Sequence, residues 1–274
     1  MTTQTSARLA PERSGAAAPV LVGCSHGTND DTGRQVVRSI LDDVRAARPG
    51  LNVREAFVDV QQPEVADVVA SVVTGDGGSG RAVVVPLLLS GGYHVEVDIA
   101  EAVADHDGQP GQAVASPALG PDPRLVDLLA HRLTEAGVRP HDAVVVAAAG
   151  SSRSGAARDV ERVADGLRDW HPGPVTVGYG AKARPSVPEA VAAARAALAD
   201  ASGPEQREGD AATPRVVVAA YLLAPGYFYD RVLEAGADVV TAPLGADPRL
   251  TSIVLDRYDS AAVTLDLSAS QSAP

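Results

Sequence analysis

The chain reads Arg81-Ala-Val-Val-Val-Pro-Leu-Leu-Leu-Ser-Gly-Gly-Tyr93-His94 in its first half and Arg215-Val-Val-Val-Ala-Ala-Tyr-Leu-Leu-Ala-Pro-Gly-Tyr227-Phe228 in its second. The two segments align without a gap, and in each an apolar run breaks into a turn of small residues. Similarity between parts of one chain indicates a repeated structural unit. This segment therefore predicts that one fold is built twice.

Three further blocks recur around that segment in the same order. They pair Val20–Thr28 with Val144–Ser152, Phe57–Val65 with Tyr179–Val187, and Ala118–Leu125 with Pro243–Leu250. Four matches in one order indicate two copies of one unit, divided near residues 135–142. We expect an N-terminal lobe over residues 19–138 and a C-terminal lobe over residues 139–266. A disordered leader (1–18), which lacks the apolar core of a signal peptide, precedes them, and a tail (267–274) follows.

Strands and helices alternate within each copy. Val20–Cys24 and Ala82–Leu89 are apolar runs without polar alternation, which is typical of strands buried on both faces. Between them, apolar residues recur at helical spacing over Val36–Val44, and Asp30, Asp31 and Thr32 are candidate N-caps. A second helix is expected over Val65–Val73. The alternation predicts an α/β fold of two tandem similar lobes, each a parallel sheet flanked by helices.

Composition and charge limit the function classes. The chain has 274 residues and is 45% hydrophobic, so it can bury a sizeable core. Its net charge of −12 argues against partners with extended phosphate or anionic lipid surfaces, and its longest apolar run, Val216–Ala224, is less than half a membrane span. Cys24 is the only cysteine, so any metal would be held by histidine and carboxylate. We expect a cytoplasmic protein without nucleic-acid or membrane partners.

Two histidines follow strands at equivalent places. His26 comes directly after the first strand and His94 just after the Ala82–Leu89 strand, each beside glycine. Ligands of parallel sheets bind at the carboxyl ends of the strands, so we expect both imidazoles in one crevice. The alternative is that each is only a hydrogen-bonded loop residue. Asp98 lies four residues after His94 on an expected helix. It either orients that imidazole or assists a bound cation from the outer sphere, or it is a helix N-terminal carboxylate favoured by the dipole.

Other motifs point to no chemistry. The loop Gly75–Gly80 lacks the Gly-Lys-Ser/Thr of a phosphate-binding loop, so ATP use finds no support. Cys24 is expected in the core, and Ser202–Pro214 is expected to be an exposed loop. The remaining histidines, which we expect to be solvated, are His106, His131, His141 and His171.

The motifs together resemble a known family. Ser25-His26-Gly27 after a strand, the segment from Pro86 to His94-x-x-x-Asp98-Ile99, and the Leu-Gly-x-Asp-Pro turn are similar to the sirohydrochlorin chelatases, class II tetrapyrrole chelatases, in their fused two-lobed form. The resemblance extends from about Val20 to Tyr258. It departs from the family pattern at Thr28–Asp31, where Ser-Arg-Asp-Pro-like residues are common, and at Asp59, where glutamate is common.

The resemblance implies ATP-independent insertion of a divalent metal into sirohydrochlorin, bound in an active cleft between the lobes. His26 and His94 would be the catalytic, metal-holding residues. No organic cofactor is implied, and Fe²⁺ or Co²⁺ is a substrate. Iron, giving sirohaem, is favoured because sirohaem is the more widely needed product. The alternatives are a cobaltochelatase of cobalamin biosynthesis acting on the same substrate and, in another class, a non-catalytic tetrapyrrole or metal carrier.

The second copy has lost both imidazoles. Ala149 stands where the first copy has His26, and Phe228 where it has His94, so we expect one active site, with the second lobe as lid and substrate wall. A fused pair can replace a dimer, and we expect a monomer. Arg153, Lys182 and Arg184 would pair with substrate carboxylates, unless they are ordinary solvated surface. The expected substrate-binding residues are Ser25, Asn29, Gly91, Gly92, Tyr93, Arg153, Lys182 and Arg184.

Overall fold

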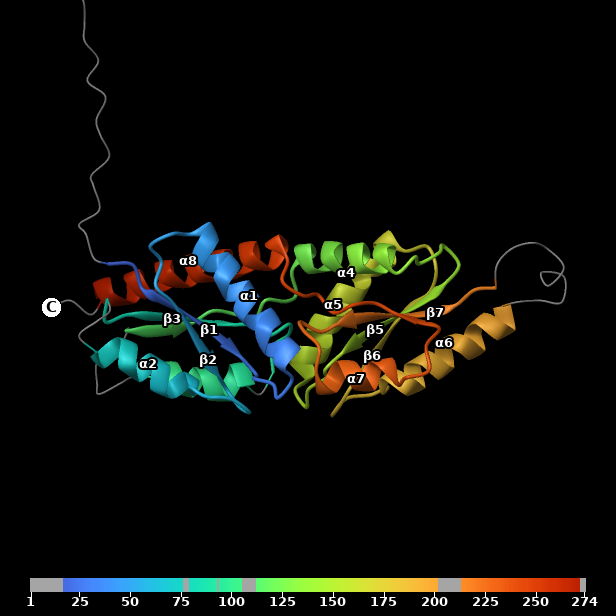
Figure 1. The fold of residues 1–274 in the computed structure, drawn as a ribbon, viewed down its shortest axis with the longest axis horizontal. Coiled ribbons are helices and arrows are strands. Elements are labelled where there is room, and N and C mark those ends of the chain that lie inside the picture. The colour runs from blue at the N-terminus through green and yellow to red at the C-terminus, as the bar shows by residue number, and fades with distance from the viewer. Residues whose placement is uncertain (1–16, 76–78, 93, 105–111, 202–212, 272–274) are drawn as a thin grey trace, which may run out of the picture.

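A computed structural model describes residues 17–75, 79–92, 94–104, 112–201 and 213–271, which form two parallel sheets (Figure 1). The first sheet has the order β2 (Val53–Phe57), β1 (Val20–Ser25), β3 (Ala82–Pro86) and β4 (Ala113–Ala115). The second repeats that order as β6 (Val175–Tyr179), β5 (Ala143–Ala148), β7 (Val216–Tyr221) and β8 (Val239–Val240). Helices flank both sheets, so the predicted α/β fold of two tandem similar lobes is confirmed.

The helices follow the same repeat. The first copy contains α1 (Asp31–Ala47), α2 (Val65–Thr74), a π-helical turn η1 (His94–Ile99), α3 (Ala100–Val103) and α4 (Pro123–Glu135). The second contains α5 (Ser154–Trp170), α6 (Val187–Ala201), α7 (Tyr227–Leu233) and α8 (Pro248–Gln271). The predicted helices of the first copy are confirmed, and Asp30 is the N-cap of α1, where its carboxylate accepts a 2.6 Å hydrogen bond from the Gly33 amide. Most of the predicted loop Ser202–Pro214 and of the leader lies outside the described residues.

Strand β3 ends earlier than the apolar run Ala82–Leu89 suggests. The sheet pairing of β3 ends at Pro86, and the Leu88 carbonyl accepts a hydrogen bond from the Leu119 amide, which lies outside the strands. The chain therefore leaves the sheet while it is still apolar, and its last leucines line the space between the lobes.

Backbone geometry shows that the two copies correspond residue by residue. Gly27 and Gly150 follow β1 and β5 and share a φ of +89°, a conformation that favours glycine. His26 and Ala149, the residues before these glycines, therefore occupy equivalent places. The second copy keeps the turn and lacks the imidazole.

The last helix of each copy packs on the other copy's lobe. Helix α4 lies against α5 and β7, whereas α8 lies against α1, β3 and β4. Figure 1 shows α8 alongside the first sheet and α4 alongside the second. One buried cluster joins Leu21 and Leu128 from the first copy with Leu167 and Ile253 from the second. The division near residue 138 remains a prediction for the sequence units, but in space each lobe is completed by the other copy's helix.

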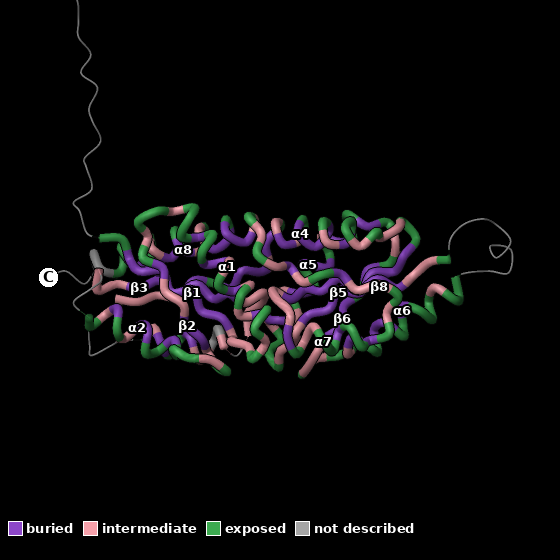
Figure 2. Tube along the Cα trace, viewed as in Figure 1, coloured by how far each residue is buried: buried purple, intermediate pink, exposed green. Residues whose placement is uncertain are grey.

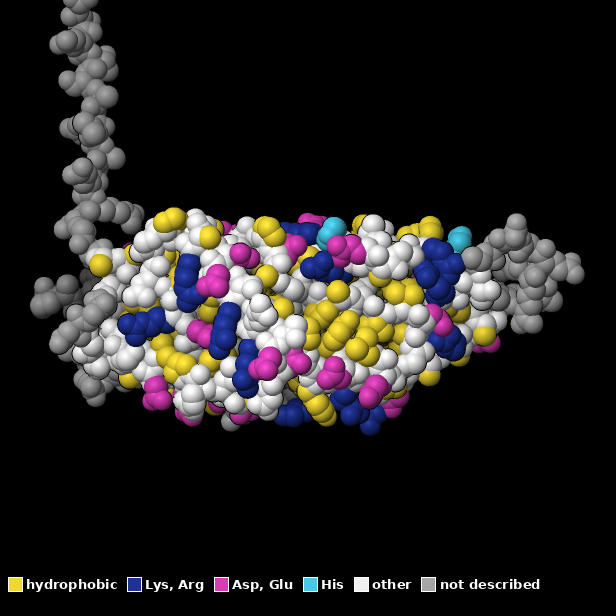
Figure 3. Space-filling model, viewed as in Figure 1, with side chains coloured by type: hydrophobic (Ala, Val, Ile, Leu, Met, Phe, Trp, Pro, Cys, Tyr) yellow, Lys and Arg dark blue, Asp and Glu magenta, His cyan; other side chains and the backbone are white. Residues whose placement is uncertain are grey.

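Burial follows these layers (Figure 2). Strands β1, β3, β5 and β7 are buried along their whole length, and the flanking helices turn their exposed side outward. Figure 3 shows charged side chains of both signs spread over one face of the molecule, with hydrophobic side chains gathered near its centre.

Candidate active site

A cleft of about 630 Å³ lies between the two lobes, within the size range of ligand pockets. Its walls are mainly the loops that leave the carboxyl ends of β1, β3, β5 and β7. Most of the lining comes from Ser25–Asp30, Leu87–Gly92 with His94, Ala148–Ser152 and Tyr221–Tyr229. Equivalent loops of the two copies thus face one another across a shared space.

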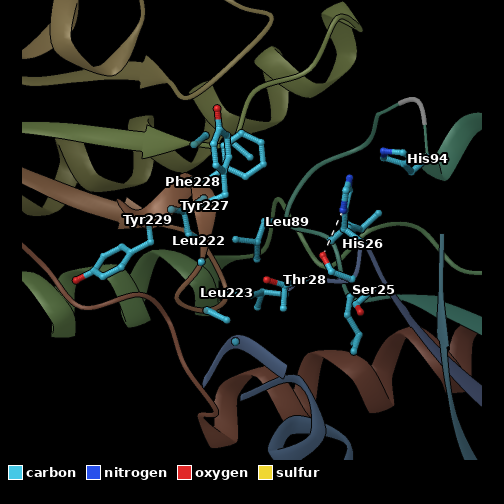
Figure 4. Close-up of a pocket in the computed structure, with 18 of the residues that line it drawn as sticks. Ser25, His26, Thr28, Leu89, His94, Leu222, Leu223, Tyr227, Phe228 and Tyr229 are labelled. Carbon is cyan, nitrogen blue, oxygen red and sulfur yellow. Dashed lines mark hydrogen bonds between the residues drawn. The ribbon is translucent and has the colours of Figure 1, made fainter. Parts of the chain in front are cut away.

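His26 and His94 meet at the first-lobe side of this cleft (Figure 4). Their ring centroids are 4.8 Å apart and the ring planes are perpendicular. The two loops follow β1 and β3, which are neighbours in the first sheet. The structure therefore brings together the two histidines that the sequence places at strand ends.

The carboxylate of Asp98 selects the tautomer of His94. Nδ1 of His94 lies 2.6 Å from Oδ2 of Asp98, and Nδ1 of His26 makes a longer contact of 3.4 Å with the Gly27 carbonyl. A carboxylate oxygen only accepts, so Nδ1 carries the proton in a neutral His94 ring. The lone pair then lies on Nε2, and neutral imidazole nitrogen is a good ligand for divalent iron, cobalt and nickel.

The segment that carries His94 and Asp98 is a π-helical turn rather than the expected α-helical start. The side chains of His94 and Asp98 are about one-third exposed, whereas Ile99 is fully buried. The wider turn allows Ile99 to enter the core while Asp98 still reaches His94. Single π turns inside helices are frequent at functional sites.

Cys24 lies in the core beneath the site. Its side chain is fully buried, and burial together with the charge of Asp98 raises the pKa of the thiol to about 12. The thiol therefore keeps its proton near neutral pH, and only a thiolate is an effective metal ligand. Cys24 is a packing residue, as expected.

Some of the predicted substrate-binding residues line the cleft and others do not. Ser25, Asn29, Gly91, Gly92 and Lys182 line the cleft, and the buried Oγ of Ser25 has no hydrogen-bond partner among the described residues. Arg153 and Arg184 lie outside the lining, and Arg184 pairs instead with Glu189. Tyr93 falls outside the described residues.

The sequence reasoning missed an aromatic wall on the second-lobe side of the cleft. Tyr227, Phe228 and Tyr229 line it, and the first two rings meet edge-on with centroids 5.4 Å apart. Tyr227 is 68% exposed, with the Arg231 guanidinium 5.8 Å from its ring centre. The sequence identified Phe228 only as the counterpart of His94, and not as part of an aromatic wall. Three consecutive aromatic residues in a chain that is 3% aromatic were an available signal.

One histidine outside the site differs from expectation. His171, predicted to be solvated, is buried, and its Nε2 donates a 2.8 Å hydrogen bond to the Asp142 carbonyl. The backbone bends at the end of α5 and turns this ring inward, where a carbonyl satisfies it. His131 and His141 are exposed as predicted, and His106 lies outside the described residues.

Two kinds of feature are absent from the described residues. None of their helices has both the length and the apolar character needed to cross a membrane. Nor do they include a group of three or more histidine, cysteine, aspartate or glutamate side chains placed to hold one metal ion.

Comparisons with known proteins agree with this architecture. The CbiX family model matches residues 20–136 and again 143–261, once for each copy. Among solved structures, SirB from Bacillus subtilis with Fe³⁺ is 20% identical with a TM-score of 0.71, covering 91% of this chain and 98% of that one. The cobalt complex of the sirohydrochlorin chelatase SirB from Bacillus subtilis subspecies spizizenii is 19% identical with a TM-score of 0.69, covering 90% and 97%.

A third solved structure is CbiX, described as the terminal enzyme for biosynthesis of siroheme in denitrifying bacteria. It is 19% identical with a TM-score of 0.58, covering 88% of this chain and 99% of that one. At these identities the likeness concerns the fold. No curated protein sequence matches the chain significantly.

Proposed function

The chain belongs to the CbiX family, and from this premise we propose that it inserts a divalent metal into sirohydrochlorin without using ATP. The observation that carries the proposal is the pair His26 and His94, with Nδ1 of His94 held by Asp98, beside a cleft between two lobes. The names of similar structures support the substrate, since one is a sirohydrochlorin chelatase and another acts in siroheme biosynthesis.

The two imidazoles suit a metal that must leave again. Two protein nitrogens leave coordination positions for water and for the incoming pyrrole nitrogens. Insertion exchanges one divalent cation for two pyrrole N–H protons, and an imidazole that has released the metal can accept a proton. Asp98 fixes the orientation of His94 through Nδ1, and its negative charge offsets part of the charge of the metal.

The opposite wall suits the macrocycle. Tyr227 and Phe228 offer aromatic faces across the cleft from the histidines, as Figure 4 shows, and a flat conjugated ring stacks well on such side chains. Lys182 supplies a positive charge in the lining, and α5 begins beside Ser151 and Ser152 without a side-chain cap. Both features favour carboxylate groups in an otherwise acidic protein.

Iron is our proposed physiological metal, and sirohaem the product. Imidazole ligands accept both Fe²⁺ and Co²⁺, and the similar SirB structures are described with Fe³⁺ and with cobalt. Cobalt insertion for cobalamin synthesis is therefore the alternative. We further propose that the protein works as a cytoplasmic monomer without an organic cofactor.

An anaerobic assay tests the proposal. Purified protein is mixed with excess sirohydrochlorin and with Fe²⁺ or Co²⁺, without ATP, and metal insertion is followed by absorbance. We expect many turnovers per protein, and the ratio of the kcat/KM values for the two metals decides between them. Stoichiometric binding without turnover would overturn the enzyme in favour of a carrier.

A further inference from the structure

The loop that carries His94 is held by residues of the other copy. The Gly91 amide donates a 3.0 Å hydrogen bond to Oδ2 of Asp159, on α5. The Leu89 carbonyl accepts a 2.8 Å hydrogen bond from the phenol of Tyr221, at the end of β7. The metal-binding side of the cleft is thus tied to the lobe that has no imidazole in the equivalent places.

The hydrogen bond from Tyr221 to the Leu89 carbonyl is buried and closely packed. Tyr221 is 2% exposed, and burial, helped by the charges of Asp159 and Asp122, raises the pKa of its phenol far above the usual range. The phenol therefore keeps its proton and acts as a donor. A Cβ atom at Gly120 would collide with both the Tyr221 hydroxyl and the Leu89 carbonyl, so glycine is what allows them to meet.

The carboxylate contact is the more accessible of the two. The side chain of Asp159 is about one-fifth exposed, and it also lies near Arg162. Hydrogen bonds from a backbone amide to a charged oxygen are stronger than neutral ones. The Gly91 peptide is therefore held firmly, three residues before His94.

Comparison of the two copies shows that these polar groups are not part of the common scaffold. Tyr221 aligns with Leu87 of the first copy. Asp159 is the sixth residue of α5, and the sixth residue of the equally long α1 is Val36. The first copy is apolar at both places, so the polar groups occur only on the side that faces the His94 loop.

We propose that Asp159 and Tyr221 are positioning residues that hold the His94 loop, so that the second lobe sets the affinity of the first lobe for metal. The proposal rests on the proposed function only in taking His94 as a metal ligand. Two fixed peptide groups before His94, with the Asp98 contact after it, hold the imidazole in place before metal arrives. Such preorganisation increases affinity without any direct contact between these residues and the metal.

Titration with Co²⁺ alone tests this, because it needs no tetrapyrrole. The visible absorption of bound Co²⁺ gives its dissociation constant in the wild type and in Tyr221→Phe, Asp159→Ala and His94→Ala. We expect Tyr221→Phe and Asp159→Ala to weaken binding roughly tenfold each. Asp159→Asn should recover part of the loss, because its amide oxygen still accepts from Gly91. Adding Tyr221→Phe to His94→Ala should cause no further loss, since the loop then has no imidazole to position.

A matched control separates positioning from general stability. Tyr258, on α8, is another buried phenol that bridges the copies, and it donates a 2.7 Å hydrogen bond to the carbonyl of Pro19. Tyr258→Phe should destabilise the fold by a similar amount and leave Co²⁺ binding unchanged. If it weakens Co²⁺ binding as much as Tyr221→Phe does, the positioning role is wrong.

The remaining outcomes distinguish the two proposals. If Tyr221→Phe and Asp159→Ala bind Co²⁺ as the wild type does while His94→Ala does not, the positioning role is overturned and the chelatase proposal stands. If Tyr221→Phe and Asp159→Ala weaken Co²⁺ binding as expected but no metal enters sirohydrochlorin, the chelatase proposal fails and the positioning role stands. If His94→Ala binds Co²⁺ normally, both fail.

Discussion

The rings of His26 and His94 lie perpendicular to each other with their centroids 4.8 Å apart, although they come from loops far apart in the sequence. The sheet brings the starts of these loops together, because β1 and β3 are paired from Val20–Ala82 to Cys24–Pro86, before the two loops begin. Buried parallel strands are rigid supports, so the bases of the two histidine loops have a defined separation.

Replacing either histidine should abolish most metal insertion. We expect His26→Ala and His94→Ala each to lower kcat/KM and Co²⁺ affinity by roughly 100-fold or more, because each removes half of the protein's nitrogen ligands. Anaerobic insertion assays and Co²⁺ titrations measure both effects. His131→Ala, on the exposed surface of α4, is the control and should behave as the wild type.

The same experiments test whether one site or two sites exist. Phe228 occupies the second-lobe place of His94, and we expect Phe228→Ala to change the KM for sirohydrochlorin while Co²⁺ affinity stays within about threefold, since a phenyl ring is no metal ligand. A loss of Co²⁺ affinity equal to that of His94→Ala would contradict a single site in the first lobe.

Removing the carboxylate of Asp98 should weaken metal binding without removing a ligand. We expect Asp98→Ala to lower Co²⁺ affinity about 10- to 100-fold, because the His94 ring loses the partner that fixes its tautomer and orientation. The amide oxygen of Asp98→Asn can still accept from Nδ1, so the Co²⁺ affinity of this variant should lie between those of the wild type and Asp98→Ala. Equal losses in both variants would show that charge, rather than orientation, is what Asp98 supplies.

The sequence predicts much of this architecture, because its information is local or repeated. The recurring segment that ends at His94 and at Phe228 indicates the duplicated α/β unit, and its apolar strands indicate buried parallel sheets. The position of both histidines at strand ends then follows from sheet geometry. The buried face of one helix or strand can be predicted from its own apolar spacing, without knowing which element packs against it.

Contacts between the copies could not be predicted in the same way. Apolar spacing shows that Leu128 and Ile253 are buried, but it does not show that α4 and α8 cover each other's lobes. The pairing of Arg184 with Glu189, outside the residues that line the cleft, depends on side-chain geometry. The sequence does mark Tyr221 as unusual, because its counterpart in the apolar run of the first copy is Leu87. This difference becomes visible only when the two copies are compared position by position.

Lys182 should contribute to binding of the anionic substrate. We expect Lys182→Gln to raise the KM for sirohydrochlorin about tenfold with little change in kcat, because a hydrogen bond to a charged group contributes about 1.5–3 kcal/mol. The wild-type KM should also rise with salt, which screens exposed charges. The control is Arg184→Gln, which removes a charge outside the cleft. An equal effect of both variants would contradict a specific contact.

Asp142 should stabilise the fold in a pH-dependent way. Burial disfavours its charge, but hydrogen bonds from Arg215 and Arg139 outweigh burial and hold the pKa of Asp142 well below its usual range. A depressed pKa in the folded state gives stability that is present above the unfolded-state pKa of about 3.9 and is lost as pH falls toward the folded value.

The variant Asp142→Asn should therefore be about 1–3 kcal/mol less stable at pH 7, because the partly exposed guanidinium groups of Arg139 and Arg215 lose their charged partner. Urea unfolding at several pH values measures this difference, which should be constant above about pH 5 and shrink below about pH 4. A difference that stays constant down to pH 2 would show that Asp142 does not titrate as described.

The exchange of α4 and α8 should make the two lobes unfold together. Trp170 is the only tryptophan and lies at the end of α5, so its fluorescence reports on the second lobe. Leu265 is buried on α8 beside Asp266, which pairs with Arg81 of the first lobe. We expect Leu265→Ala to destabilise the protein by about 2–5 kcal/mol and to shift the Trp170 transition by that full amount, because neither core is complete without the other copy's helix. Leu267→Ala, an exposed position on the same helix, should shift it little. A first-lobe transition detected by circular dichroism that moves alone, with the Trp170 signal unchanged, would show that the lobes are independent despite the exchanged helices.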